Sequence, residues 1–160
     1  MDITMNIRRR TYTIYKGEEC LFYKDENDKY VISTRNKKIS DDTFTIEEYS
    51  NGHVWYTKEV TPEDIGEVYE VEPYAIHEGE EFFILGWTKD EETLSLATNS
   101  DELAEKYNAH GCGRGERYDF DLPKDEVKVI EYVRYFDKYK YFAGEGFQYY
   151  KEERVEVLNP

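Results

Sequence analysis

A short aromatic pattern occurs nearly three times along the chain, and this repetition constrains the fold more than any other feature. Residues 12–22 read Tyr-Thr-Ile-Tyr-Lys-Gly-Glu-Glu-Cys-Leu-Phe, and residues 74–84, 62 positions later, read Tyr-Ala-Ile-His-Glu-Gly-Glu-Glu-Phe-Phe-Ile. A fainter third copy begins at Tyr139. A fixed period of this length is typical of supersecondary units that bury their apolar faces only when they stack on one another. The sequence therefore predicts a repeated architecture, and it indicates no particular chemistry.

Each copy has the pattern of a tight β-hairpin. Apolar and polar side chains alternate on both sides of the central glycine, which is typical of two antiparallel strands. We therefore expect Gly17, Gly79 and Gly144 in hairpin turns. Further strands are predicted at 30–34 and 93–98, where β-branched and aromatic residues follow polar turn clusters.

The segments that connect these strands differ between the copies. Asn99 and Ser100 are good N-cap residues, so a short helix is expected after them, ending before Gly111. Residues 40–50 fit either a helix, by analogy with that segment, or a strand, by their β-branched residues, and the analogy favours the helix. Thr61 and Pro62 predict a single helical turn, because Pro suits the first helical position.

The expected organisation has three parts. A first β-rich repeat spans 1–72, a second spans 73–133, and a C-terminal hairpin at 134–160 packs on the second repeat as a partial third copy. Five short strands with one helical turn before the last strand resemble the architecture of small SH3-like barrels. The expected fold class is mainly β (α+β), with two tandem SH3-like or meander β units, one short helix and a C-terminal hairpin, and the resemblance transfers no binding residue to this chain.

The composition is strongly acidic and rich in tyrosine. The net charge is −15, and the chain has 16 Tyr among its 160 residues. Such a field repels nucleic acid and anionic membranes and steers basic partners toward the protein. Solubility alone is the competing explanation of the acidic balance. We expect a basic protein partner, no direct contact with nucleic acid and no membrane association, while the oligomeric state stays open.

Cysteine usage and the N-terminus favour a reducing compartment. Cys20 and Cys112 have no redox or metal-binding spacing, and neither a signal sequence nor a membrane-spanning apolar run is visible. The three histidines do not have zinc-ligand spacing. We therefore expect a cytoplasmic protein without a metal or cofactor.

Two groups of residues form the principal candidate binding surface. Tyrosine buries a large area at little entropic cost, which makes exposed tyrosines good anchors for a partner. The expected anchors lie in the C-terminal aromatic run: Tyr135, Tyr139, Tyr141 and Tyr149. The expected steering residues are the acids of the second repeat: Glu80, Glu81, Asp90, Glu91 and Glu92. Adjacent strand residues point to opposite faces, so catalysis by the Glu80/Glu81 pair is not expected.

The glycine-rich loop after the predicted helix is an alternative ligand site. Its candidate residues are His110, Cys112, Arg114, Arg117 and Tyr118. A phosphate site is disfavoured because the loop follows a helix C-terminus, where the helix dipole repels anions. A plain connection between helix and strand is the favoured interpretation.

Together these features favour a non-enzymatic binding protein. Its most concrete form is an inhibitor or immunity-type protein that neutralises a basic partner such as a nuclease toxin. The alternatives are a β module that binds a small molecule or peptide, and a DNA mimic whose carboxylates are spaced like phosphates.

Overall fold

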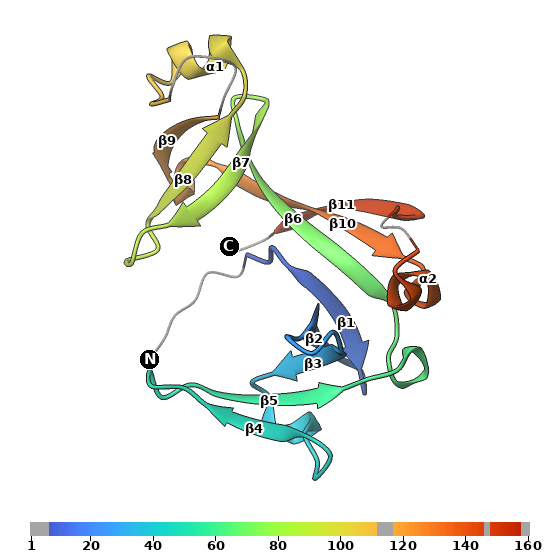
Figure 1. The fold of residues 1–160 in the computed structure, drawn as a ribbon. Helices are drawn as coiled ribbons and strands as arrows, with labels where there is room; N and C mark the ends of the chain where they lie inside the picture. Colours follow the sequence, from blue (N-terminus) through green and yellow to red (C-terminus); the bar gives the residue numbers. More distant parts are fainter. Residues whose placement is uncertain (1–6, 112–116, 146–147, 158–160) are drawn as a thin grey trace. The chain divides into compact units, whose positions relative to one another are not determined.

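The protein is mainly β, as the sequence predicts (Figure 1). The structure is a computed structural model that describes residues 7–111, 117–145 and 148–157. In these residues, antiparallel strands dominate and the helices are short.

The elements follow one another in two comparable series. The first series comprises β1 (Thr11–Tyr15), β2 (Glu18–Lys24), β3 (Tyr30–Thr34), η1 (Lys37–Ile39), β4 (Thr45–Glu48), β5 (Val54–Glu59) and η2 (Pro62–Asp64). The second series comprises β6 (Val68–His77), β7 (Glu80–Trp87), β8 (Thr93–Thr98), α1 (Asp101–Lys106), β9 (Tyr118–Pro123), η3 (Lys124–Glu126), β10 (Lys128–Phe136), α2 (Lys138–Ala143) and β11 (Lys151–Val157).

The chain divides into two compact units. Unit I joins Arg9–Val71 to Val133–Glu153, and unit II contains Glu72–Tyr132 with the described residues at 7–8 and 154–157. The strands β6, β10 and β11 therefore contribute residues to both units. Within the described part of the C-terminal segment, residues 134–145 and 148–153 belong to unit I and residues 154–157 to unit II.

The first hairpin of each unit has the same register. In unit I, Tyr12 pairs with Leu21 and Tyr15 with Glu18; in unit II, Tyr74 pairs with Phe83 and His77 with Glu80, each 62 positions later. Unit I continues in the order β4-β5-β3-β2-β1-β6, and unit II in the order β6-β7-β8-β9, with β10 also pairing with β6.

Two-residue turns with positive φ close these hairpins. Lys16 and Gly17 have φ of 50° and 80°, and Glu78 and Gly79 have φ of 50° and 82°. Positive φ at both central residues is the requirement of a type I′ turn, whose twist matches that of the flanking strands. Gly17 and Gly79 thus occupy hairpin turns, as predicted.

The prediction for Gly144 is wrong. Residues Lys138–Ala143 form α2, and Gly144 is its left-handed C-cap with φ of 68°. The Asp137 carboxylate accepts hydrogen bonds from the backbone N–H of Tyr139, at 3.0 Å, and of Lys140, at 3.2 Å. This N-cap starts a helix where the aromatic pattern alone indicated a strand. The C-terminal segment returns as β11 and pairs with β10, but it does not repeat the first hairpin.

The preference for a helix at 40–50 is also wrong. Thr45–Glu48 form β4, which pairs with β5 through a turn in which Gly52 has φ of 83°. The β-branched residues and the Asn51-Gly52 turn thus outweigh the analogy with the second repeat. The other predicted helix is present as α1, and the Ser100 hydroxyl accepts a bond from the Leu103 N–H at 3.2 Å.

Each unit has its own apolar core. In unit I the core packs around Phe22, Ile32 and Val68, and the rings of Tyr30, Tyr141 and Phe142 lie against it. The core of unit II comprises Ile7, Ala75, Phe82, Ile84, Leu94, Leu96, Phe120 and Val129. The α2 helix is therefore an integral part of unit I.

A buried ion pair fixes the N-terminal segment within unit II. Glu131 is 3% exposed, and its carboxylate accepts bonds from the Arg8 backbone N–H at 3.0 Å and from Nη2 at 2.9 Å. Burial of a charge is costly unless the charge is paired and hydrogen-bonded, and Arg8 provides both.

We predict that Glu131→Gln lowers the free energy of unfolding by about 2–3 kcal/mol, because the partly buried guanidinium of Arg8 loses its counter-charge. Urea denaturation measures the change. The control Glu156→Gln removes an exposed partner of Lys128 and should cost at most about 1 kcal/mol. Equal effects of the two substitutions would show that the buried pair has no special role.

Candidate functional site

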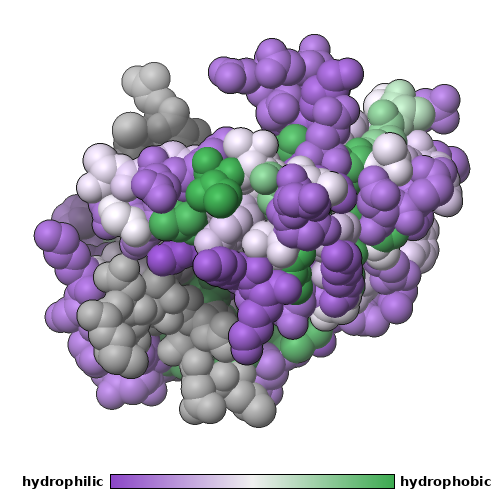
Figure 2. Space-filling model, turned by 90° about the horizontal axis from the view of Figure 1, so that it is seen from below, coloured by the Kyte–Doolittle hydropathy of each residue, from purple (hydrophilic) through white to green (hydrophobic). Residues whose placement is uncertain are grey.

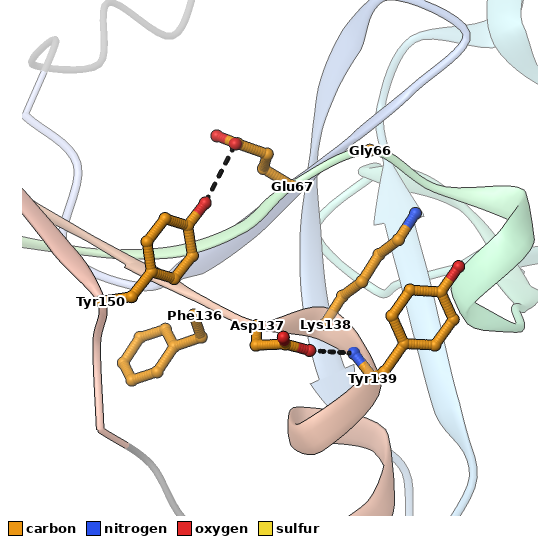
Figure 3. Close-up of a pocket in the computed structure, with 7 residues that line it drawn as sticks. All are labelled: Gly66, Glu67, Phe136, Asp137, Lys138, Tyr139 and Tyr150. Carbon is orange, nitrogen blue, oxygen red and sulfur yellow. Dashed lines mark hydrogen bonds between the residues drawn. The ribbon is translucent and has the colours of Figure 1, made fainter.

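An aromatic hollow of about 490 Å³ lies on unit I (Figure 3). Three stretches of chain line it: the approach to β6, the junction of β10 with α2, and the residue just before β11. The lining residues are Gly66, Glu67, Phe136, Asp137, Lys138, Tyr139 and Tyr150. In Figure 3, Tyr150 and Tyr139 lie on opposite sides of the hollow, with Asp137 between them.

Hydrogen bonds hold this lining in place. The Tyr150 hydroxyl donates to Glu67 Oε1 at 3.0 Å, and its backbone N–H donates to the Tyr135 carbonyl at 2.9 Å. The Lys138 ammonium donates to the Ile65 carbonyl at 2.7 Å. The hollow thus rests on contacts between residues 83 and 73 positions apart in sequence.

A second hollow of about 470 Å³ shares Phe136, Asp137 and Tyr150 with the first. It is completed by Lys140, Glu145, Gln148 and Tyr149. The three tyrosines Tyr139, Tyr149 and Tyr150 are 56%, 48% and 60% exposed. Large apolar side chains are rarely so exposed in a group, and such patches often mark interaction sites.

The hollows combine aromatic rings with carboxylates. Glu67, Asp137 and Glu145 line one or both of them. Burial, and then the hydrogen bond to Glu67, raise the pKa of Tyr150 above its ordinary value, so its hydroxyl stays a neutral donor. Rings and carboxylates together suit a cationic group, which is attracted to ring faces and forms ion pairs with the acids.

The predicted aromatic anchors separate into two kinds. Tyr139 and Tyr149 are exposed at the hollows. Tyr135 is half-buried: its hydroxyl donates to the Glu153 carboxylate at 3.2 Å, and its ring packs on Tyr69. Tyr141 packs against the core of unit I. The sequence analysis did not single out Glu67, Asp137 or Tyr150, although Tyr150 belongs to the same aromatic run.

The predicted steering acids lie in unit II, and several are engaged within it. Glu81 accepts a bond from the Tyr132 hydroxyl at 2.8 Å and pairs with Arg154 at 3.7 Å. Asp90 accepts bonds from Thr88 and from the Glu92 N–H, and these bonds lower its pKa. Glu80 and Glu92 are exposed and Glu91 is half-buried. The predicted steering acids therefore belong to unit II, whereas the exposed tyrosines of the hollows belong to unit I.

The described residues of the alternative loop site make contacts within the fold. Cys112 and Arg114 lie outside the described residues. His110 pairs with Asp119 through two backbone bonds of 2.8 Å, and Arg117 Nε lies 3.5 Å from Asp119 Oδ1. Tyr118 is 8% exposed, and its hydroxyl donates to Asp101 at 2.5 Å, which ties β9 to α1.

Residues 7–138 match the family described as Uncharacterised conserved protein UCP033725. The chain belongs to this family. No curated protein and no solved structure matches the chain. The matched residues include both hairpins and most of the lining of the first hollow, but not Tyr139 or Tyr150.

Within residues 7–111, 117–145 and 148–157, no group of three or more His, Cys, Asp or Glu side chains is arranged to hold a metal ion. None of their helices is long and apolar enough to cross a membrane.

The thiol of Cys20 is buried in unit I. It is 2% exposed, and burial, reinforced by the charge of Glu18, raises its pKa from 9.0 to about 11. The thiolate is the nucleophilic form, so this thiol should be chemically inert in the folded protein.

We predict that Cys20 resists alkylation by iodoacetamide at pH 9, where an ordinary thiol is substantially ionised. Because the pKa is raised in the folded state, this group stabilises the fold below pH 9, and that contribution is lost as the pH rises through about 11. The rate of alkylation of Cys20 is measured by mass spectrometry in a Cys112→Ser variant, with urea-unfolded protein as the control. Equal rates in folded and unfolded protein would contradict the assignment.

Proposed function

We propose that this protein is a non-enzymatic binding protein that recognises a basic protein partner through the two hollows of unit I. The observation that carries the proposal is the pairing of exposed aromatic rings with carboxylates around Phe136 and Asp137. A lysine or arginine side chain of the partner is the expected occupant.

The lining of the first hollow suits such a cation in two ways. Tyr139 and Tyr150 offer exposed rings beside the buried Phe136, and cation–π contacts contribute about 0.5–2 kcal/mol depending on desolvation. Glu67 and Asp137 supply two negative charges against the single positive charge of Lys138.

Lys138 already makes one cation contact in this hollow. Its ammonium is engaged by the Ile65 carbonyl and lies 5.5 Å from the Tyr139 ring centroid. In Figure 3 its side chain extends toward Gly66. The carboxylate of Asp137 is in turn held by the first N–H groups of α2 and cannot swing away without loss of that N-cap.

The charge of the whole chain supports the same class of partner. A net charge of −15 attracts basic proteins over a distance set by ionic strength, and hydrophilic residues are spread across the face in Figure 2. In its most concrete form the function is inhibition of a basic protein such as a nuclease toxin, in the manner of an immunity protein. A cytoplasmic location is part of this proposal.

We predict that affinity capture from the native source at low salt retains basic proteins, and that Tyr139→Ala reduces their retention. With a purified partner, loss of an aromatic anchor should raise the dissociation rate constant by about tenfold or more and leave the association rate constant nearly unchanged. The control Ile46→Ala removes an exposed apolar side chain of β4 and should change neither rate.

Salt provides a second test of the same proposal. The association rate constant should fall as salt rises, since the charges that steer the encounter are screened over about 8 Å at physiological ionic strength. An acidic partner, a salt-independent association rate or unchanged dissociation in Tyr139→Ala would each contradict the proposal.

A further inference from the structure

A third hollow region of unit I differs in charge from the two hollows described above, because its lining carries an arginine and no carboxylate. It lies on the outward face of β2, β3 and β5, and Arg10, Leu21, Tyr23, Ser33, Tyr49 and Trp55 line a space of about 190 Å³. A neighbouring space of about 280 Å³ shares Arg10, Leu21 and Tyr23 with it. None of these residues belongs to the proposed partner surface.

Strand register explains why these side chains meet. Leu21 pairs with Ser33, and Ser33 pairs with Thr57, so the three lie on one face, together with Tyr23 and Trp55 two positions along their strands. The opposite face carries the core residues Cys20, Phe22 and Ile32. The lining is therefore the outer surface of the same sheet whose inner surface forms the core.

Hydrogen bonds organise the polar part of this face. The Tyr23 hydroxyl lies 2.7 Å from Ser33 Oγ, which lies 3.2 Å from Thr57 Oγ1. The Tyr49 hydroxyl donates to Glu47 at 2.9 Å. Both tyrosine side chains are thus held by their hydroxyl groups, and the residues remain exposed, at 42% for Tyr23 and 52% for Tyr49.

Arg10 brings an uncompensated positive charge to this face. Its backbone carbonyl accepts a bond from the Val71 N–H at 2.9 Å, which fixes the main chain just before β1. Its exposed guanidinium has no ion pair and no hydrogen bond with any residue in 7–111, 117–145 or 148–157. The guanidinium of Arg35 lies 5.9 Å from the centroid of the Trp55 ring. Glu47, which accepts the bond from Tyr49, is not among the residues that line the hollow.

Unit II shows that the fold does not require this set. The equivalent positions, taken from the 62-residue offset and the shared register, replace the arginine by Glu72, the serine by Ala97 and the tryptophan by Arg117. A register shift between Ile84 and Gly86 places Gly86 opposite Ser95, where unit I has Tyr23 opposite Val31. The same hairpin scaffold therefore forms without the hollow's arginine, tyrosine, serine or tryptophan. A role in ligand binding accounts for their presence in unit I.

We propose that this hollow binds a small planar anion, an aromatic carboxylate in which one ring carries the acid group. The ring would stack on Trp55 and Tyr49, and the carboxylate would pair with the guanidinium of Arg10. A cavity of about 150 Å³ accommodates a benzene ring, so 190 Å³ suits one ring with a small substituent. The site is independent of the proposed partner surface, since it differs in residues and in charge.

Trp55 provides a direct readout for this site. The chain has two Trp, so a Trp87→Phe protein reports from Trp55 alone. The probe is 4-nitrobenzoate, whose nitro group quenches indole fluorescence, and nitrobenzene and 4-nitrobenzylamine are its neutral and cationic analogues. We expect saturable quenching by the carboxylate, and binding at least about tenfold weaker for both analogues, because a hydrogen bond to a charged group is lost.

Substitution of Arg10 tests the anion contact. Arg10→Gln should weaken binding of 4-nitrobenzoate by about tenfold, and Arg10→Lys, which keeps the charge, should recover part of the affinity. The matched control Arg154→Gln removes an exposed arginine from unit II and should leave binding unchanged. Tyr139→Ala should also leave it unchanged, which separates this site from the partner surface.

Several outcomes would overturn the proposal. They are the absence of saturation up to about 10 mM probe, equal affinity for the neutral analogue, and equal affinity of Arg10→Gln and the parent protein. Circular dichroism of each variant verifies that it is folded. If Arg10→Gln does not fold, the affinity of Arg10→Lys for 4-nitrobenzoate tests the contact instead, and an affinity equal to that of the parent protein would contradict it.

Discussion

The structure depends on two short turns in which a non-glycine residue and a glycine both adopt positive φ. At Lys16-Gly17 and at Glu78-Gly79 this geometry fixes the first pairing of each unit, and every later strand is added to that register. A shift by one residue would exchange the two faces of the sheet. It would move Phe22 or Phe82 from the core to the solvent, so the turns determine which side chains become core and which become surface.

The acidic, tyrosine-rich composition has a direct structural use. Among the described residues, tyrosine hydroxyls donate to carboxylates within their own unit: Tyr49 to Glu47, Tyr69 to Glu19, Tyr74 to Glu72, Tyr118 to Asp101, Tyr132 to Glu81, Tyr135 to Glu153 and Tyr150 to Glu67. A charge-assisted bond of this kind gives a carboxylate a donor in addition to any basic partner, such as Arg154 at Glu81. Glu19 and Glu81, the second members of the repeated acidic pairs, both take this role. The chain thus accommodates an excess of acids while its aromatic rings add apolar area.

Local patterns were sufficient for some elements of the fold and not for others. The hairpins at 12–22 and 74–84, the capped helix α1 and the turn at Thr61-Pro62 depend on nearby residues, and the sequence predicts them. The third aromatic copy failed because the Asp137 cap, which the pattern does not include, starts a helix there. The candidate sites were harder still. Tyr139 and Tyr149 stand out as aromatic residues, but Glu67 reaches their surface only through contacts between distant segments.

One scaffold therefore carries different surfaces in its two units. Inward-facing positions stay apolar in both, with Phe22 and Ile32 in unit I and Ile84 and Leu96 in unit II. The outward positions diverge from Arg10 and Trp55 in unit I to Glu72 and Arg117 in unit II. Since the hydrogen-bonded ladder and the core need only the inward set, the outward set is free to vary with binding. The differences between the units, more than their similarities, are where the function of this protein should be sought.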